Sequence, residues 1–223
     1  MGDMGNFESL LEARDLWDKM TELSRLAYLQ ALAEPLARKH GGDAILTRIM
    51  DSDESLEGVV AASLLARPGS PASGFAASRL LRALHEGTRS EKLLALVTLP
   101  PGNPEVQRAM LELAQSDDVF LRTAALELLL KSATHADQAL KRLHTIAASK
   151  DADAYEASRV LALRGDEPSI VRVERQLGAP HAADRLGAAR LLLKIKRWTG
   201  VARALTDDHP AVRLAMACDV WAG

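Results

Sequence analysis

Apolar residues recur at intervals of three and four along most of this chain, which is the period of helices that bury one face. The clearest stretch is residues 117–131, DDVFLRTAALELLLK. Asp117 or Asp118 can cap a helix, and Lys131 ends the stretch with the charge that a helix C-terminus favours. Its apolar stripe consists of Leu121, Ala125, Leu128 and Leu129. The pattern predicts a helix here.

A second helical pattern directly precedes this one. Pro104 suits the start of a helix over residues 104–115, and the gap to residue 118 leaves room only for a tight turn. Two helices joined so closely are expected to form an antiparallel hairpin. The same scheme predicts three more hairpins: 135–148 with 152–163, 168–177 with 181–196, and 198–205 with 210–222.

The N-terminal half is also expected to be helical. Residues 7–39 form one helix or two, because Thr21 can cap a second helix and Pro35 would kink or split it. Further helices are predicted at 43–50, 56–66, 72–85 and 90–99. In the third of these, Phe75, Leu80, Leu81 and Leu84 are expected to point inward. Aromatic residues make up 4% of the chain and β-branched runs are scarce, so we predict an all-α protein.

A repeated unit organises the second half. Aligning Arg122, Glu156, Arg185 and Arg213 gives steps of 34, 29 and 28 residues. A recurring unit of about 30 residues is typical of a solenoid.

The turn-plus-helix pattern, strongest in DDHPAVRLAMA at residues 207–217, resembles HEAT-like repeats. The short spacing is similar to the bilin-lyase-like variety of these repeats, and the resemblance covers about residues 90–223. It implies an α-α superhelix of about six or seven hairpins, a single domain over 1–223, and an N-terminal helical cap at 1–40. In such repeats Asp and Arg residues form a ladder between adjacent turns, so we expect Asp117, Asp118 and Arg122 to be structural.

Charge and cysteine content bear on which partners and which cellular compartment are expected for this protein. The net charge of −2 gives no bulk electrostatic case for nucleic acid, although residues 1–60 carry −6 and residues 159–223 carry +4. This asymmetry favours a polarised partner or head-to-tail association, or it reflects only drift in the charge of solvated helix faces. Cys218, the single cysteine, cannot form an intramolecular disulfide and is interpreted as a small core hydrophobe. With no signal-peptide or membrane-spanning pattern, we expect a cytoplasmic protein.

Motifs for catalysis or cofactor binding are absent from the sequence. It holds no phosphate-binding Gly-rich loop and no G-x-S-x-G nucleophile motif. The pair His85-Glu86 resembles one half-site of HEAT-like deoxyhypusine hydroxylases, which need several such pairs. We therefore predict no catalytic residue, no metal site and no cofactor.

The most suggestive surface is basic. Arg190, Lys194 and Arg197 follow one another at i, i+4 and i+7, with Trp198 alongside. The resemblance implies that second helices of the hairpins line a concave face. These four residues are thus predicted to bind a protein partner with an acidic segment, in a non-enzymatic scaffold or adaptor.

Two alternatives remain open from the sequence. The first is a nucleic-acid-binding protein similar to HEAT-like alkylpurine DNA glycosylases, for which Asp184 and Asp219 are the candidate catalytic residues by proximity to the basic patch. The second is a bilin-lyase-like enzyme, which the short repeat motivates. Self-association through the ends of the solenoid is a further possibility, unless Trp221 folds over the last helix.

Overall fold

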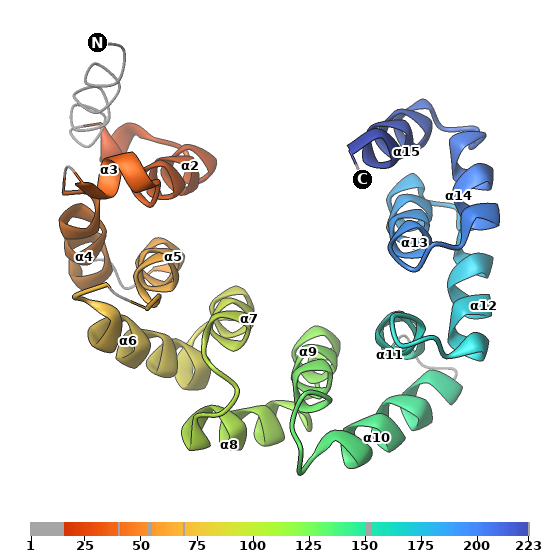
Figure 1. The fold of residues 1–223 in the computed structure, drawn as a ribbon, viewed down its shortest axis with the longest axis horizontal. Coiled ribbons are helices and arrows are strands. Elements are labelled where there is room, and N and C mark those ends of the chain that lie inside the picture. Colours follow the sequence, from red (N-terminus) through yellow and green to blue (C-terminus); the bar gives the residue numbers. More distant parts are fainter. Residues whose placement is uncertain (1–15, 40, 53–54, 69, 150–152, 223) are drawn as a thin grey trace. The chain divides into compact units, whose positions relative to one another are not determined.

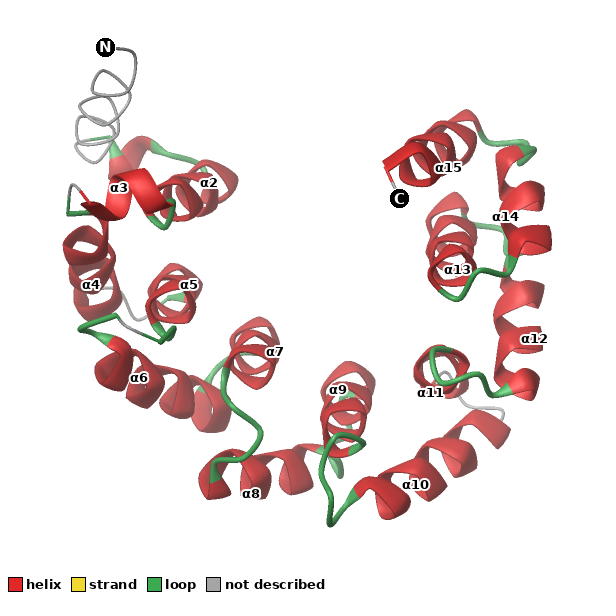
Figure 2. Cartoon of the chain, in the orientation of Figure 1, coloured by secondary structure: helices red, strands yellow, loops and turns green. Residues whose placement is uncertain are grey.

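The computed structural model describes residues 16–39, 41–52, 55–68, 70–149 and 153–222, and within these ranges every regular element is a helix (Figures 1 and 2). The all-α prediction is confirmed. Helices pack mainly against their neighbours in sequence. The chain divides into two compact units, Met1–Leu113 and Ala114–Gly223.

The first unit contains a short 3-10 helix and seven α-helices within the described ranges. Figure 1 shows α2, α5 and α7 in one layer of this unit and α4, α6 and α8 in a second layer. The described elements are η1 (Trp17–Lys19), α2 (Glu22–Leu32), α3 (Pro35–Lys39), α4 (Gly42–Ser52), α5 (Leu56–Leu65), α6 (Ser73–Glu86), α7 (Arg89–Thr98) and α8 (Pro104–Leu113).

The second unit repeats the two-layer arrangement. Helices α9, α11, α13 and α15 form one layer and α10, α12 and α14 the other (Figure 1). Their bounds are α9 (Val119–Leu129), α10 (Ala136–Ala148), α11 (Asp153–Ala162), α12 (Glu167–Gln176), α13 (Ala182–Lys194), α14 (Trp198–Leu205) and α15 (Pro210–Ala222). The predicted hairpins 135–163, 168–196 and 198–222 are confirmed as helix pairs, whereas the predicted pair 104–131 is divided between the two units.

Local side-chain chemistry explains where several helices begin. The hydroxyl of Thr21 accepts a hydrogen bond from the backbone N–H of Ser24, which starts α2, and Pro35 opens the separate helix α3. The described part of the region 7–39 is therefore split, while residues 7–15 lie outside the described ranges. The predicted cap at 1–40 is described only from residue 16 onward. Asp118 caps α9 by accepting from the N–H groups of Phe120 and Leu121, as the sequence indicated.

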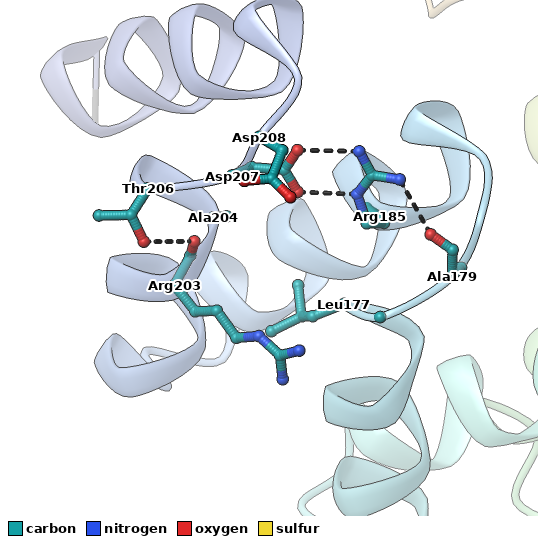
Figure 3. A pocket seen from close by; sticks show the side chains of 9 residues that line it. Leu177, Ala179, Arg185, Arg203, Ala204, Thr206, Asp207 and Asp208 are labelled. Carbon is teal, nitrogen blue, oxygen red and sulfur yellow. Dashed lines mark hydrogen bonds and ion pairs between the residues drawn. The ribbon is translucent and has the colours of Figure 1, made fainter.

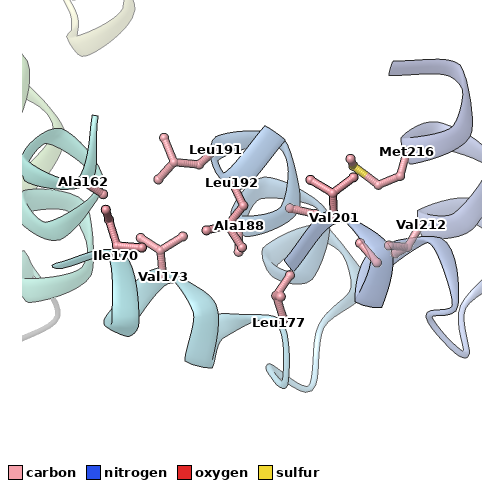
Figure 4. Close-up of a cluster of buried hydrophobic side chains, with 12 residues drawn as sticks. Ala162, Ile170, Val173, Leu177, Ala188, Leu191, Leu192, Val201, Val212 and Met216 are labelled. Atoms are coloured by element: carbon pink, nitrogen blue, oxygen red, sulfur yellow. The ribbon is translucent and has the colours of Figure 1, made fainter. Parts of the chain in front are cut away.

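The core of the second unit lies between its two layers. Figure 4 shows buried side chains of α12, α13, α14 and α15 meeting there. The cluster consists of Ala162, Ile170, Val173, Leu177, Ala188, Ala189, Leu191, Leu192, Val201, Ala204, Val212 and Met216. A Cβ atom at Gly200 would lie 2.5 Å from Cδ1 of the fully buried Leu192, so the absence of a side chain lets α14 approach α13 closely.

Two expectations about exposure are wrong, and one alternative that the sequence left open is decided. Phe75 is 76% exposed, because the buried stripe of α6 runs through Leu80 and Leu84, and Phe75 lies off it. Cys218 is exposed rather than in the core, since α15 buries the face that carries Met216, and Cys218 lies roughly opposite. Trp221 is 93% exposed, so it does not fold over α15.

Helix length and polarity also bear on membrane insertion. Within the part of the chain that the structure describes, no helix is at once long and apolar enough to cross a bilayer.

Candidate functional site

The predicted basic surface begins on α13. Arg190 and Lys194 are one helical turn apart, and both are exposed. The guanidinium of Arg190 donates from Nε to Oδ2 of Asp219 on α15 at 2.7 Å, and this hydrogen bond raises the pKa of Arg190. The Arg190 side chain nevertheless keeps 54% of its surface exposed. The charge is thus held in place by α15 and still faces solvent.

Arg197 does not continue this face. Helix α13 ends at Lys194, and Lys196 adopts a left-handed conformation with φ of 60°. This turn makes Arg197 the residue before α14, where its guanidinium pairs with Glu167, the first residue of α12. The predicted i, i+7 relationship between Arg190 and Arg197 on one helix is therefore wrong, although both cations remain partly exposed.

Trp198 completes the predicted set. It is the first residue of α14 and is 58% exposed. An exposed indole beside a partly exposed guanidinium gives a flat apolar surface next to a cation, which suits contact with another macromolecule. Binding by these four residues remains a prediction.

The two aspartates considered for a glycosylase-like reaction, Asp184 and Asp219, have different surroundings. Asp219 accepts the hydrogen bond from Arg190, so its carboxylate is already used to join α13 and α15. Asp184 lies in the first turn of α13 and is exposed. An acid in this position is favoured by the helix dipole alone.

A second polar site lies between the turn before α13 and the turn before α15. Figure 3 shows Arg185 and Asp207 facing each other beside Leu177, Arg203 and Asp208. These residues surround a cavity of about 480 Å³. Arg185 donates from Nε and Nη2 to the two carboxylate oxygens of Asp207 at 2.8 and 2.9 Å, and from Nη1 to the carbonyl of Ala179 at 2.9 Å.

These contacts shift the pKa of both ionised groups. The Arg185 hydrogen bonds, together with one from the backbone N–H of His209, lower the pKa of Asp207 to about 2. The Asp207 carboxylate in turn raises the pKa of Arg185. A fully committed bidentate pair of this kind is suited to joining structural elements rather than to transferring a proton.

Asp and Arg side chains join adjacent turns, as expected for Arg122, although the acid that pairs with it is neither Asp117 nor Asp118. Arg122 of α9 pairs with Asp153 at the start of α11 and donates to the carbonyl of Ser116. Asp118 instead caps α9, and Asp117 is exposed. The arginine of one turn thus binds the acid of the next.

Sequence reasoning missed a cluster that unites Ser, His and Asp. His144, Ser158, Asp166 and Ser169 line a cavity of about 210 Å³ between α10, α11 and α12. The His144 Nδ1 and Asp166 Oδ1 atoms are 3.9 Å apart, beyond hydrogen-bond distance, and Asp166 caps α12 by accepting from the Ser169 N–H. Ser158 donates to the carbonyl of Ala154 at 2.6 Å.

This cluster is not arranged for nucleophilic catalysis. A nucleophile must lie within hydrogen-bond reach of its base, and the base must be oriented by a third group. Here the carboxylate serves as a helix cap and the Ser158 hydroxyl is bound to its own helix. No sequence motif signalled the cluster, because its members come from three helices.

Side chains that could ligate a metal are scattered. Within residues 16–39, 41–52, 55–68, 70–149 and 153–222, no three His, Cys, Asp or Glu side chains are grouped so that they could hold a metal ion. His85, the residue that suggested a di-iron half-site, is exposed near the end of α6.

Comparisons of the chain with protein-family models, curated proteins and solved structures found no match.

Proposed function

We propose that this protein is a non-enzymatic interaction scaffold that binds an acidic protein segment through Arg190, Lys194, Arg197 and Trp198. The observation that carries the proposal is that Arg190 is fixed by Asp219 and yet 54% exposed. Fixing a long cationic side chain before binding reduces the entropy lost when a partner arrives. Lys194 extends the positive surface, and Trp198 supplies an apolar anchor.

The wider architecture is part of the same proposal. It holds that the chain is a HEAT-like solenoid of six or seven hairpins that forms one domain over residues 1–223. The two-layer packing of sequence neighbours within each unit supports the helical hairpins. In such a fold the second helices line the concave face, which is where solenoids bind partners. We place the protein in the cytoplasm, in keeping with its single cysteine.

The structure suggests a sharper test than simple charge reversal. Arg190→Gln removes the cation and its bond to Asp219, whereas Asp219→Asn removes the carboxylate and leaves the cation. Tagged wild-type protein, these two variants and Trp198→Ala would be used to capture partners from the native lysate, with captured proteins quantified by mass spectrometry. Nuclease would be added to half of each sample.

The proposal expects one set of proteins to be captured by wild type and to fall at least about fivefold with Arg190→Gln and Trp198→Ala. Capture by Asp219→Asn should fall by less than this, because the cation remains but is no longer held in place before binding. Equal loss with Arg190→Gln and Asp219→Asn would mean that the ion pair is structural and would overturn the assigned surface. Capture that disappears with nuclease in every sample would replace the scaffold by the nucleic-acid alternative.

A further inference from the structure

Among the described helices of at least eight residues, four carry arginine at their fourth residue: Arg25 in α2, Arg122 in α9, Arg185 in α13 and Arg213 in α15. Each of these guanidinium groups donates to a backbone carbonyl in the segment before its own helix. The acceptors are Trp17 for Arg25, Ser116 for Arg122, Ala179 and Pro180 for Arg185, and Asp207 and Asp208 for Arg213. The arginine therefore fixes the entry to its helix.

In three cases the same arginine also binds an acid at the start of the next helix in its layer. Arg25 pairs with Glu57 of α5 at 3.5 Å, Arg122 pairs with Asp153 of α11, and Arg185 pairs with Asp207 before α15. Each of these ion pairs joins an arginine on one helix to a carboxylate at or before the start of the next helix in the same layer.

Arg213 has only the first kind of contact. Among the described residues no carboxylate pairs with Arg213, which donates from Nη1 to the carbonyls of Asp207 and Asp208 at 2.6 and 3.0 Å. Beside it runs an apolar stripe at i, i+3, i+4 and i+7, all of it exposed. The stripe consists of Leu214, Ala217, Cys218 and Trp221, with Leu214 68% and Trp221 93% exposed.

The equivalent face of α13 shows which kind of helix packs on such a surface. There Arg185 binds Asp207, Arg190 binds Asp219, and Ala189 between them is fully buried. A helix with a carboxylate at its start covers this face of α13. The face of α15 presents the matching arginine and is uncovered.

The described part of the chain also holds a carboxylate, at the start of a helix, that forms no such ion pair. Glu22 is the first residue of α2, the position that Asp153 occupies in α11, and it is exposed with no ion-pair partner among the described residues. The adjacent Leu23 is 78% exposed. On α2 an acid without a described ion-pair partner lies next to an exposed leucine. On α15 an arginine without a described carboxylate partner lies next to an exposed apolar stripe, so the two surfaces are complementary in charge and in apolar character.

We propose that α15 of one molecule binds α2 of a second copy of this chain, with Glu22 paired to Arg213 and Leu23 seated against Leu214 and Trp221. The two surfaces differ, so the contact is heterologous and adds molecules head to tail. The contact uses none of the four residues assigned to partner binding, and its test is independent of that function.

Sedimentation velocity over a concentration series tests this association. Wild-type protein should sediment progressively faster as its concentration rises. Glu22→Lys and Arg213→Glu should each weaken association by about tenfold or more, because each creates a like-charge pair at the contact. The double variant, which restores an opposite-charge pair in reversed order, should return association to within about threefold of wild type.

A mixture of the two single variants gives the sharpest result. Each variant alone can offer only like-charge contacts between its own copies. In the mixture, every contact between the Glu22→Lys variant and the Arg213→Glu variant joins opposite charges, so the two should associate in alternation. Trp221→Ser removes an almost fully exposed side chain and should weaken association without lowering helix content, which guards against a folding effect of Arg213→Glu.

A protein that is monomeric at every concentration would overturn the proposal. Association that Arg213→Glu weakens and Glu22→Lys leaves unchanged would overturn it as well, because it would assign the face of α15 to a symmetric contact or to a different partner.

Discussion

Arg185 binds both carboxylate oxygens of Asp207, from Nε at 2.8 Å and from Nη2 at 2.9 Å. One of those oxygens also accepts the backbone N–H of His209 at 2.8 Å, so a single carboxylate holds the turn before α15 and joins it to α13. The pair lies beside the buried core of the second unit. Its ionisation state should therefore affect how firmly α15 is held.

Acid should weaken this connection. The pKa of Asp207 is lowered from an ordinary 3.8 to about 2, so the carboxylate contributes its full stabilisation above pH 3.8 and loses it as the pH falls toward 2. Thermal unfolding followed by circular dichroism should show a lower midpoint for Asp207→Asn at neutral pH, and a difference from wild type that shrinks across this window.

The neighbouring aspartate provides a matched control. Asp208→Asn leaves both Arg185 bonds in place and should keep the wild-type acid dependence. If Asp207→Asn and wild type lost stability in parallel between pH 3.8 and about 2, the pair would not be a source of that dependence.

Two glycines in neighbouring helices should respond in opposite directions to the same substitution. At Gly200 a Cβ would lie 2.5 Å from Leu192 Cδ1, and Leu192 is fully buried, so Gly200→Ala should destabilise the protein by about 1–3 kcal/mol. At Gly187, within α13, a Cβ would meet nothing within 4 Å. Gly187→Ala should therefore stabilise by about 0.5–1 kcal/mol through helix propensity.

Urea unfolding of the two variants beside wild type measures both effects. The same sign of change in both would contradict the close approach of α14 to α13. An unchanged slope with denaturant would show that only stability, and not the extent of unfolding, has changed.

Truncation of two apolar residues on α6 should separate its buried and exposed faces. Leu80 is fully buried, so Leu80→Ala should cost about 2–5 kcal/mol of unfolding free energy. Phe75 is 76% exposed, and Phe75→Ala should change stability by no more than about 0.5 kcal/mol. Urea unfolding compares the two directly, and a cost for Phe75→Ala close to that for Leu80→Ala would show that Phe75 is covered in solution.

Helix positions could be predicted because their signals are local. Asp118 as a cap, Pro104 as a helix start, Pro35 as a break in the helical region, and the apolar period of each segment act within a few residues. The orientation of a helix depends on its neighbours, which explains the error at Phe75. On α6 the sequence placed Leu80 and Leu84 inward correctly, but it added Phe75, which lies off the face where these two leucines pack.

The candidate site was harder to predict for the same reason. The end of α13 depends on Lys196 in a left-handed conformation, which the sequence normally signals with glycine or asparagine, so Arg197 was placed on the wrong face. The link between Arg185 and Asp207 joins residues 22 positions apart, and nothing in the local pattern selects that acid over Asp208. Only the packing of α15 on α13 decides it.

The links between arginines and acids also bear on how the chain folds. They join residues near in sequence, 22 apart for Arg185 and Asp207 and 32 apart for Arg25 and Glu57, and the helices they connect pack on their immediate neighbours. Closing such short loops costs little chain entropy, and proteins dominated by local contacts fold rapidly. Each helix pair can therefore assemble as soon as its own residues leave the ribosome, before the rest of the chain has been synthesised.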